Sequence, residues 1–327
     1  MRSLQEKLFS KSYIASTVFS ILCLILWLLP FLFCEGHIQS SSISFLGVPF
    51  LELSPLVACV LQFVFFVVIG NVVNSFMLSL NLVPFQNRYF YFIFLLFVSF
   101  VPNIQSFSNA SIAFIFFLIS VAQLIKTSQA ENVFRVFNST FFLSIAVLFK
   151  VEYVYFLLFF ILALLFLRAF TIRTLFASLL GMISATIIVV SLLYLGDNIL
   201  ILQSYFALAK QMGGLNLFSS LSIVNILGIV LLLIFLMFYV FSFISNRYTK
   251  SINVRSCSAL VNFLLVATFI VYGISLQQIV DSLYFILLFV SYFATLFYVH
   301  NRNKFANYSL ILTVSIALLY RITELVF

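Results

Sequence analysis

The chain has 327 residues, of which 65% are hydrophobic and only 7% are charged, and its net charge is +8. A soluble domain carries roughly a quarter charged residues, so this composition excludes a fold surrounded by water and indicates a membrane protein. The basic residues are spread thinly along the chain instead of clustering. That spread excludes a nucleic-acid partner and favours contact with anionic membrane lipids.

Apolar runs predict eleven membrane-spanning helices in a single transmembrane domain, residues 1–327. The fold class is therefore all-α, a polytopic helical bundle. The third to sixth runs are shorter than the roughly twenty residues that a bilayer requires, so a thinned bilayer or neighbouring helices must shield them. The expected spans are Tyr13–Cys34, Ser54–Leu80, Arg88–Val101, Asn109–Ile125, Val136–Phe149, Val151–Leu167, Leu175–Leu195, Leu221–Ser245, Ser258–Ser275, Val280–Val299 and Tyr308–Val326.

The charges between the runs predict the orientation. If the chain crosses at every run, thirteen basic residues fall on one side and three on the other. Lys and Arg are retained on the cytoplasmic side, which predicts a multi-pass protein of the bacterial cytoplasmic (inner) membrane with a cytoplasmic N-terminus. The cytoplasmic set is Arg2, Lys7, Lys11, Arg88, Lys126, Arg135, Arg168, Arg173, Arg247, Lys250, Arg255, Arg302 and Lys304, and the outer set is Lys150, Lys210 and Arg321.

Two segments on the expected outer side are long enough to carry structure. Residues 35–53 have an apolar second half that can lie along the membrane interface. Residues 197–220 contain an amphipathic stretch, Ile199–Met212, that can form either an interfacial or a re-entrant helix. Because the expected cytoplasmic loops are short, any working face is expected outside.

Lys150 and Glu152 lie at the outer turn between two short runs. An ionisable residue costs about 2.5–3.5 kcal/mol at the centre of a span, so this pair needs an explanation. If the turn brings the side chains together, Lys150 can contact a lipid phosphate or an acidic substrate while Glu152 orients it. The alternative is that both side chains reach out to the head groups.

Glu35 and His37 directly follow the first run. A carboxylate beside an imidazole can act as a base on a substrate at the outer face. The alternative is that these residues simply end a span in solvent. Other polar residues on the outer side form a rim with them if the helices converge: Glu52, Asp197, Lys210, Gln277, Gln278 and Asp281.

Three polar residues, Asn71, Asn74 and Ser75, lie deep in the second run. They are expected to hold neighbouring helices through hydrogen bonds, with a substrate lining as the alternative. Asn109-Ala-Ser matches a glycosylation sequon by pattern alone. The four cysteines form no cluster with histidine, so neither a metal site nor a cofactor is expected.

The stretch 109–185 contains, in order, a run, a short charged loop, a run ending in Leu-Phe-Lys, an immediate return run, basic residues and a run with a glycine. In this order it resembles an uncharacterised family of Phe-rich inner-membrane proteins from Bacteroidota. It is also similar to the central spans of polyprenyl-phosphate-dependent glycosyltransferases of the C class.

The second resemblance implies a C-class glycosyltransferase membrane core that acts on a polyprenyl-phosphate-linked substrate at the outer face. Those enzymes keep a catalytic acid just after the first span, where this chain has Glu35 as candidate base and Glu52 as a second carboxylate. Their outer lysine near the central hairpin corresponds to Lys150, which would face the lipid phosphate. The first outer loop lacks the Asp-Asp pair of those enzymes.

The sequence leaves three functions open. The first is a transferase for a lipid-linked sugar at the outer face. The second is a non-catalytic membrane component that binds protein partners in a cell-envelope assembly or secretion complex. The third is a lipid transporter or flippase, which the odd number of runs and the lack of buried charges disfavour.

Overall fold

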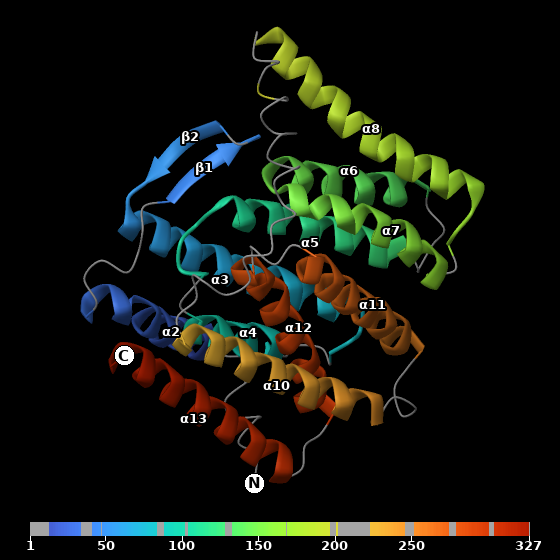
Figure 1. Ribbon diagram of the computed structural model, residues 1–327. Helices are drawn as coiled ribbons and strands as arrows, with labels where there is room; N and C mark the ends of the chain where they lie inside the picture. The colour runs from blue at the N-terminus through green and yellow to red at the C-terminus, as the bar shows by residue number, and fades with distance from the viewer. Residues whose placement is uncertain are drawn as a thin grey trace.

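The computed structural model describes residues 13–33, 41–46, 48–83, 88–101, 104–127, 133–167, 169–196, 201, 223–245, 252–274, 279–300 and 304–326. These residues form eleven α-helices, one short 3-10 helix and one two-stranded sheet (Figure 1). The expected all-α bundle is confirmed, and each expected run coincides with a helix. The elements are α2 (Tyr13–Phe33), β1 (Ser41–Phe45), β2 (Val48–Leu53), α3 (Pro55–Ser79), α4 (Tyr89–Phe100), α5 (Asn109–Thr127), α6 (Val133–Phe149), η2 (Val151–Tyr153), α7 (Val154–Phe166), α8 (Ile172–Leu195), α10 (Ile223–Ser245), α11 (Ile252–Ile274), α12 (Ile279–His300) and α13 (Lys304–Val326).

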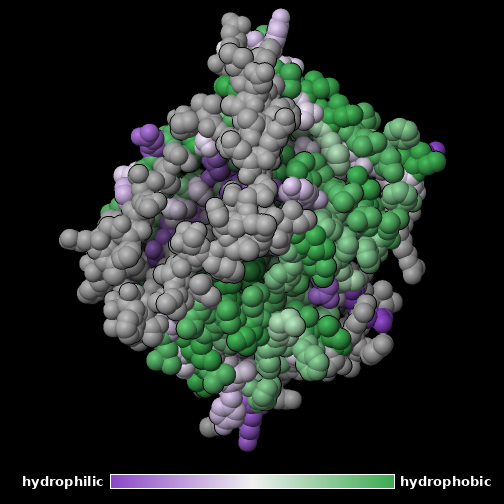
Figure 2. All heavy atoms as spheres, in the orientation of Figure 1, coloured by the Kyte–Doolittle hydropathy of each residue, from purple (hydrophilic) through white to green (hydrophobic). Residues whose placement is uncertain are grey.

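Among the described residues, five helices are long and apolar enough to cross a membrane by length and composition: α3, α5, α8, residues 227–244 of α10 and residues 282–299 of α12. The outer surface of the bundle is itself apolar, as the green atoms in Figure 2 show. A helix satisfies its backbone hydrogen bonds internally, which a lipid surrounding requires. This is the architecture of a multi-pass membrane protein.

Helices α4 and α12 form the centre of the bundle. Residues 282–299 of α12 are almost wholly buried, and α12 packs against α4, α10 and α11. Helix α4 has only 12 residues, and α2, α3, α12 and α13 surround it. Neighbouring helices therefore shield this short apolar helix, as expected from its length.

Helices α5, α6 and α8 form a second layer, at the top of Figure 1. Ser120 Oγ of α5 donates to the carbonyl oxygen of Ser139 in α6, and Ser139 Oγ donates back to the carbonyl oxygen of Ser120 at 3.0 Å. Helix α8 approaches α6 closely at Gly181, where a Cβ would lie 2.6 Å from the carbonyl oxygen of Phe137. Small residues permit this close packing, which replaces the hydrophobic effect between helices in lipid.

The segment expected on the outer side contains an antiparallel hairpin of β1 and β2, with Ser41 opposite Leu53 and Phe45 opposite Val48. Leu46 at the tip has a φ of 52° and is 1% exposed. A bulky side chain rarely adopts this left-handed conformation. Contacts of Leu46 with residues at the ends of α6 and α8 stabilise it.

Contacts between helix ends show which termini lie together. Arg88 Nη1 of α4 donates to Ser16 Oγ of α2 at 2.8 Å, and Arg135 Nη1 of α6 donates to the carbonyl oxygen of Lys126 in α5 at 2.6 Å. Lys126 Nζ lies 5.7 Å from the centroid of the Phe76 ring in α3. The starts of α2, α4 and α6 and the ends of α3 and α5 therefore share one end of the bundle, which we call the basic end.

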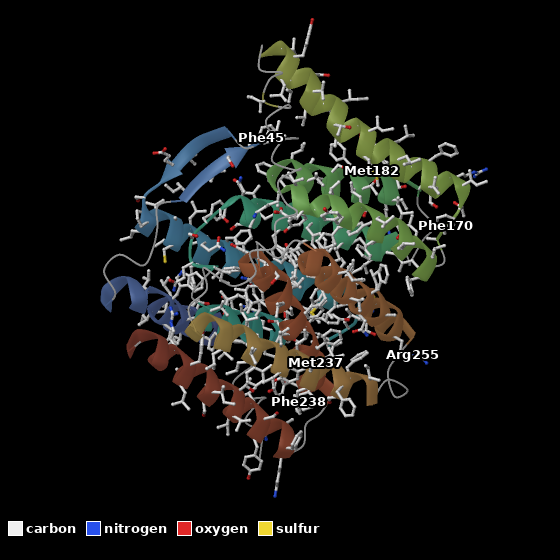
Figure 3. The ribbon with its side chains drawn as sticks, in the orientation of Figure 1. Phe45, Phe170, Met182, Met237, Phe238 and Arg255 are labelled. Carbon is white, nitrogen blue, oxygen red and sulfur yellow. The ribbon has the colours of Figure 1, made fainter. Side chains whose placement is uncertain are left out.

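The hairpin lies at the opposite end, which we call the hinge end because α6 turns into α7 there. Figure 3 shows Phe45 of the hairpin near one end of the bundle, and Phe170 and Arg255 at the other. Helices that follow one another therefore alternate in direction, as a chain that crosses a membrane repeatedly must.

Candidate functional site

The hinge between α6 and α7 brings Lys150 and Glu152 to the hinge end. Lys150 is extended (φ −144°, ψ 112°), and the three residues of η2 complete the reversal of the chain. The amide of Lys150 donates to the carbonyl oxygen of Ala146 at 3.1 Å. The carbonyl oxygen of Lys150 accepts from the amide of Tyr153 at 3.2 Å. These bonds fix the backbone on both sides of Glu152.

The two side chains of the hinge differ in burial. Lys150 is partly exposed, whereas Glu152 is only 2% exposed. The expectation that both side chains reach the head groups is therefore wrong for Glu152. The reason is that η2 packs against α6 and α7, and this packing buries the Glu152 side chain. A carboxyl group buried at the edge of a membrane domain is costly and is a candidate for function.

An aromatic cluster lies directly under the hinge. The Tyr153 ring lies 5.8 Å from Phe117, 5.8 Å from Phe156 and 5.7 Å from Phe285, measured between centroids. Phe156 and Phe285 stack at 5.4 Å. These rings come from α5, η2, α7 and α12, so the hinge rests on a packed apolar base and has little freedom to move.

The hairpin packs against the hinge from the side. The rings of Phe45 and Phe149 lie 5.4 Å apart, and Leu46 packs against Leu148 and Val189. Asn109, the first residue of α5, holds the hairpin: its Oδ1 accepts from the amide of Ser44 at 2.8 Å, and its Nδ2 donates to Ser44 Oγ. The Asn109 side chain of the sequon therefore joins the hairpin to α5.

Asn109→Ala is expected to destabilise the hairpin by about 1 kcal/mol, because the buried side of β1 loses two hydrogen bonds. Limited proteolysis of the purified protein should cleave residues 41–53 faster in this variant. Ser42→Ala, a change in the same strand, serves as the control. Equal cleavage rates in the two variants would contradict the role of Asn109.

Glu52 does not reach the hinge. It lies on β2 opposite Ser42 and is exposed. Since a strand rises about 3.3 Å per residue, Glu52 is about 13 Å along β2 from Val48 at the tip that contacts the hinge. The outer carboxylate suggested as a second catalytic group is therefore at the base of the hairpin, beside the start of α3.

Several expected site residues lie outside the described part of the chain. These are Glu35, His37, Asp197, Lys210, Gln277 and Gln278, together with the side chain of Asp281. Of the expected outer rim, the described structure therefore contains only the side chain of Glu52.

Sequence reasoning missed a buried polar ring between three helices. Gln62 Nε2 of α3 donates to Tyr284 Oη of α12 at 2.9 Å, and Ser111 Oγ of α5 donates to Gln62 Oε1 at 2.8 Å. Because the Ser111 proton is already used, Tyr284 donates to Ser111 Oγ, 3.0 Å away. Within the ring each member gives one hydrogen bond and accepts one, and Ser111 Oγ also accepts from the amide of Ser108 at 3.3 Å. The ring therefore stabilises the packing of α3, α5 and α12. The lone Gln62 in an apolar run was the available signal.

Arg321 also proves to be buried, at 1% exposed. Its Nη2 donates to the carbonyl oxygen of Leu26 in α2 at 3.3 Å. Pro30 follows four residues later and has no N–H, so the intrahelical partner of that carbonyl is missing. Arg321 replaces it, which gives this cation a structural role at a proline inside a span.

The three polar residues expected deep in the second run lie on two different faces of α3. Asn71 and Ser75 are exposed, and they bond within their own helix, to Val67 and Asn71 carbonyl oxygens at 2.9 Å. Asn74 alone is buried. The expectation that Asn71 joins neighbouring helices is therefore wrong, since Asn71 lies about 60° around the helix from Asn74 and is exposed on the outer surface.

Over the residues that the structure describes, no group of three or more His, Cys, Asp and Glu side chains is placed to hold a metal ion. No family model matches the sequence, and neither the curated proteins nor the solved structures contain a significant match.

Proposed function

We propose that the chain crosses the bacterial inner membrane eleven times, with a cytoplasmic N-terminus, and acts on a lipid-linked substrate at the outer face in the manner of a C-class glycosyltransferase. Two observations support the orientation. Alternating helices bring Arg88, Lys126 and Arg135 to one end, and the hinge lies at the other. Retention of basic residues in the cytoplasm then makes the hinge end the outer end.

The observation that carries the proposal is the burial of Glu152 beside the partly exposed Lys150. Lys150 is the described cation closest in sequence to the hinge turn, and it would bind the phosphate of the lipid carrier as a point charge. Glu152 would orient Lys150 or the substrate from below. Glu35, which stands where the glycosyltransferases that the sequence resembles carry their acid, would accept the proton from the acceptor hydroxyl.

The test is conversion of a radiolabelled polyprenyl-phosphate-linked sugar by the purified protein in nanodiscs. We expect Lys150→Ala and Glu152→Gln each to lower turnover about tenfold, the value of one charge-assisted hydrogen bond. Glu35→Gln should abolish turnover. Lys304→Ala, at the start of α13, is the control and should retain it.

Each variant, and the wild-type protein, has a result that would contradict the proposal. Full turnover in both hinge variants would remove the hinge from the site. Full turnover in Glu35→Gln would remove that residue from the reaction. If the wild-type protein converts no lipid-linked sugar of any kind, the transferase proposal fails.

One observation favours the second function, a non-catalytic component of an envelope assembly or secretion complex. The sheet has only two strands within the described residues. Asn109 occupies the Ser44 amide on β1, which leaves β2 with the edge that can pair with a partner. Leu51 on β2 is 45% exposed, and Glu52 beside it is also exposed. Co-purification of a defined envelope protein, lost when Leu51 is replaced by proline, would support this role.

A further inference from the structure

A lateral groove extends from the basic end of the bundle towards the aromatic cluster under the hinge, where Phe117 lines it. It measures about 370 Å³, within the range of small-molecule sites, and is formed by the second halves of α3, α5 and α12 and the first half of α11. Its lining is almost entirely apolar, and it includes Phe65, Ile115, Ala122, Val261 and Leu288.

The mouth of the groove faces the membrane. Val68 and Val72 of α3 both line the groove and are 53% and 61% exposed. In a protein surrounded by lipid, an exposed apolar rim at this depth contacts acyl chains rather than water. The molecules that can enter are therefore those of the bilayer itself.

Two polar side chains, Tyr292 and Gln123, interrupt this apolar lining. Tyr292 of α12 lines the groove and is 7% exposed, and its hydroxyl group is buried with no hydrogen-bond partner in the described structure. A buried hydroxyl normally has a partner, so an unmet donor in a ligand-sized groove points to an acceptor on the ligand. Tyr292 is eight residues before the end of α12, or about 12 Å from that end.

A cation lies at the end of the same groove. Lys126 is in the last turn of α5, and its Nζ lies 5.7 Å from the ring of Phe76, which lines the groove. Gln123, one turn earlier, also lines it. At the end of a membrane helix, a lysine is at the level of the lipid phosphates.

We propose that this groove binds an anionic glycerophospholipid from the leaflet at the basic end. One acyl chain lies along the apolar lining, an ester carbonyl oxygen accepts the hydrogen bond of Tyr292, and the phosphate lies beside Lys126. A glycerophospholipid carries this chain, acceptor and anion in this order. The site is distinct from the hinge, so it stands or falls independently of the proposed transferase activity.

The experiment titrates the purified full-length protein in detergent with phosphatidylglycerol and counts bound lipid by native mass spectrometry. The dialkyl ether analogue has the same head group and chains but no ester carbonyl. We expect the ester lipid to bind more tightly than the ether, and Tyr292→Phe to weaken the ester lipid about fivefold while leaving the ether unchanged. Tyr308→Phe, an exposed tyrosine of α13, is the matched control.

Two further variants test the rest of the site. Lys126→Ala should remove the preference for phosphatidylglycerol over phosphatidylcholine, and Lys304→Ala should keep it. Ala122→Phe, which fills the groove, should weaken both phosphatidylglycerol and its ether at least tenfold. The proposal is overturned if Tyr292→Phe binds the ester lipid as the wild type does, or if Ala122→Phe leaves binding unchanged in protein with a wild-type unfolding temperature.

Discussion

Replacing Gly181 by leucine is expected to lower the free energy of unfolding by about 3 kcal/mol, since the new side chain has no room between α8 and α6. A Cβ at Gly181 would clash with Thr140 Oγ1 and would lie 2.6 Å from the carbonyl oxygen of Phe137. The threonine hydroxyl can rotate away. The carbonyl group is part of the α6 backbone, so relief of that clash requires the helices to separate.

Thr186→Leu is the matched control for this prediction. Thr186 lies on the same helix and is exposed, so leucine there projects into lipid. Unfolding of the purified variants in mixed micelles, followed by circular dichroism against the fraction of denaturing detergent, measures the difference. Equal stabilities would show that α8 and α6 are not in close contact at Gly181.

Replacing Tyr284 by phenylalanine is expected to cost about 2 kcal/mol, although only one oxygen atom is removed. The change leaves Gln62 Nε2 without its acceptor. Ser111 Oγ loses the donor Tyr284 and keeps only the amide of Ser108, at 3.3 Å. All three residues are buried, so water cannot replace the lost partner. The effect should appear as a lower unfolding temperature and a weaker association of α12 with α3 and α5.

The triple variant Gln62→Leu, Ser111→Ala and Tyr284→Phe tests the ring as a unit. Because it removes every polar member, it should be more stable than the sum of the three single changes predicts, by at least 1 kcal/mol. Tyr194→Phe, at an exposed tyrosine, should have no effect. Strictly additive single effects would mean that the three side chains act separately.

The positions of the helices were predictable from the sequence because long apolar runs in lipid have one stable backbone form. Ser54–Leu80 was expected and Pro55–Ser79 is observed, bounded by a proline at the first helical position. The start of α8 was missed by three residues, since Thr171 and Thr174 form a capping box and the helix begins before the apolar run.

The hairpin was not predictable in the same way. Its strands, Ser41–Phe45 and Val48–Leu53, are short and are joined at Leu46, which is not a typical turn residue. Burial of Leu46 against α6 and α8 offsets its unfavourable φ, and that contact exists only in the folded bundle.

By itself, the sequence determined the class of this protein, the extent of its helices and the segregation of its basic residues, because these depend on composition and on apolar runs. The tertiary structure decided which faces of those helices meet. Most of the helices are apolar on every side, so hydrophobic periodicity does not distinguish a face that contacts lipid from one that contacts protein. For that reason the burial of Glu152, the ring around Gln62 and the groove at Tyr292 appear only once the helices are packed.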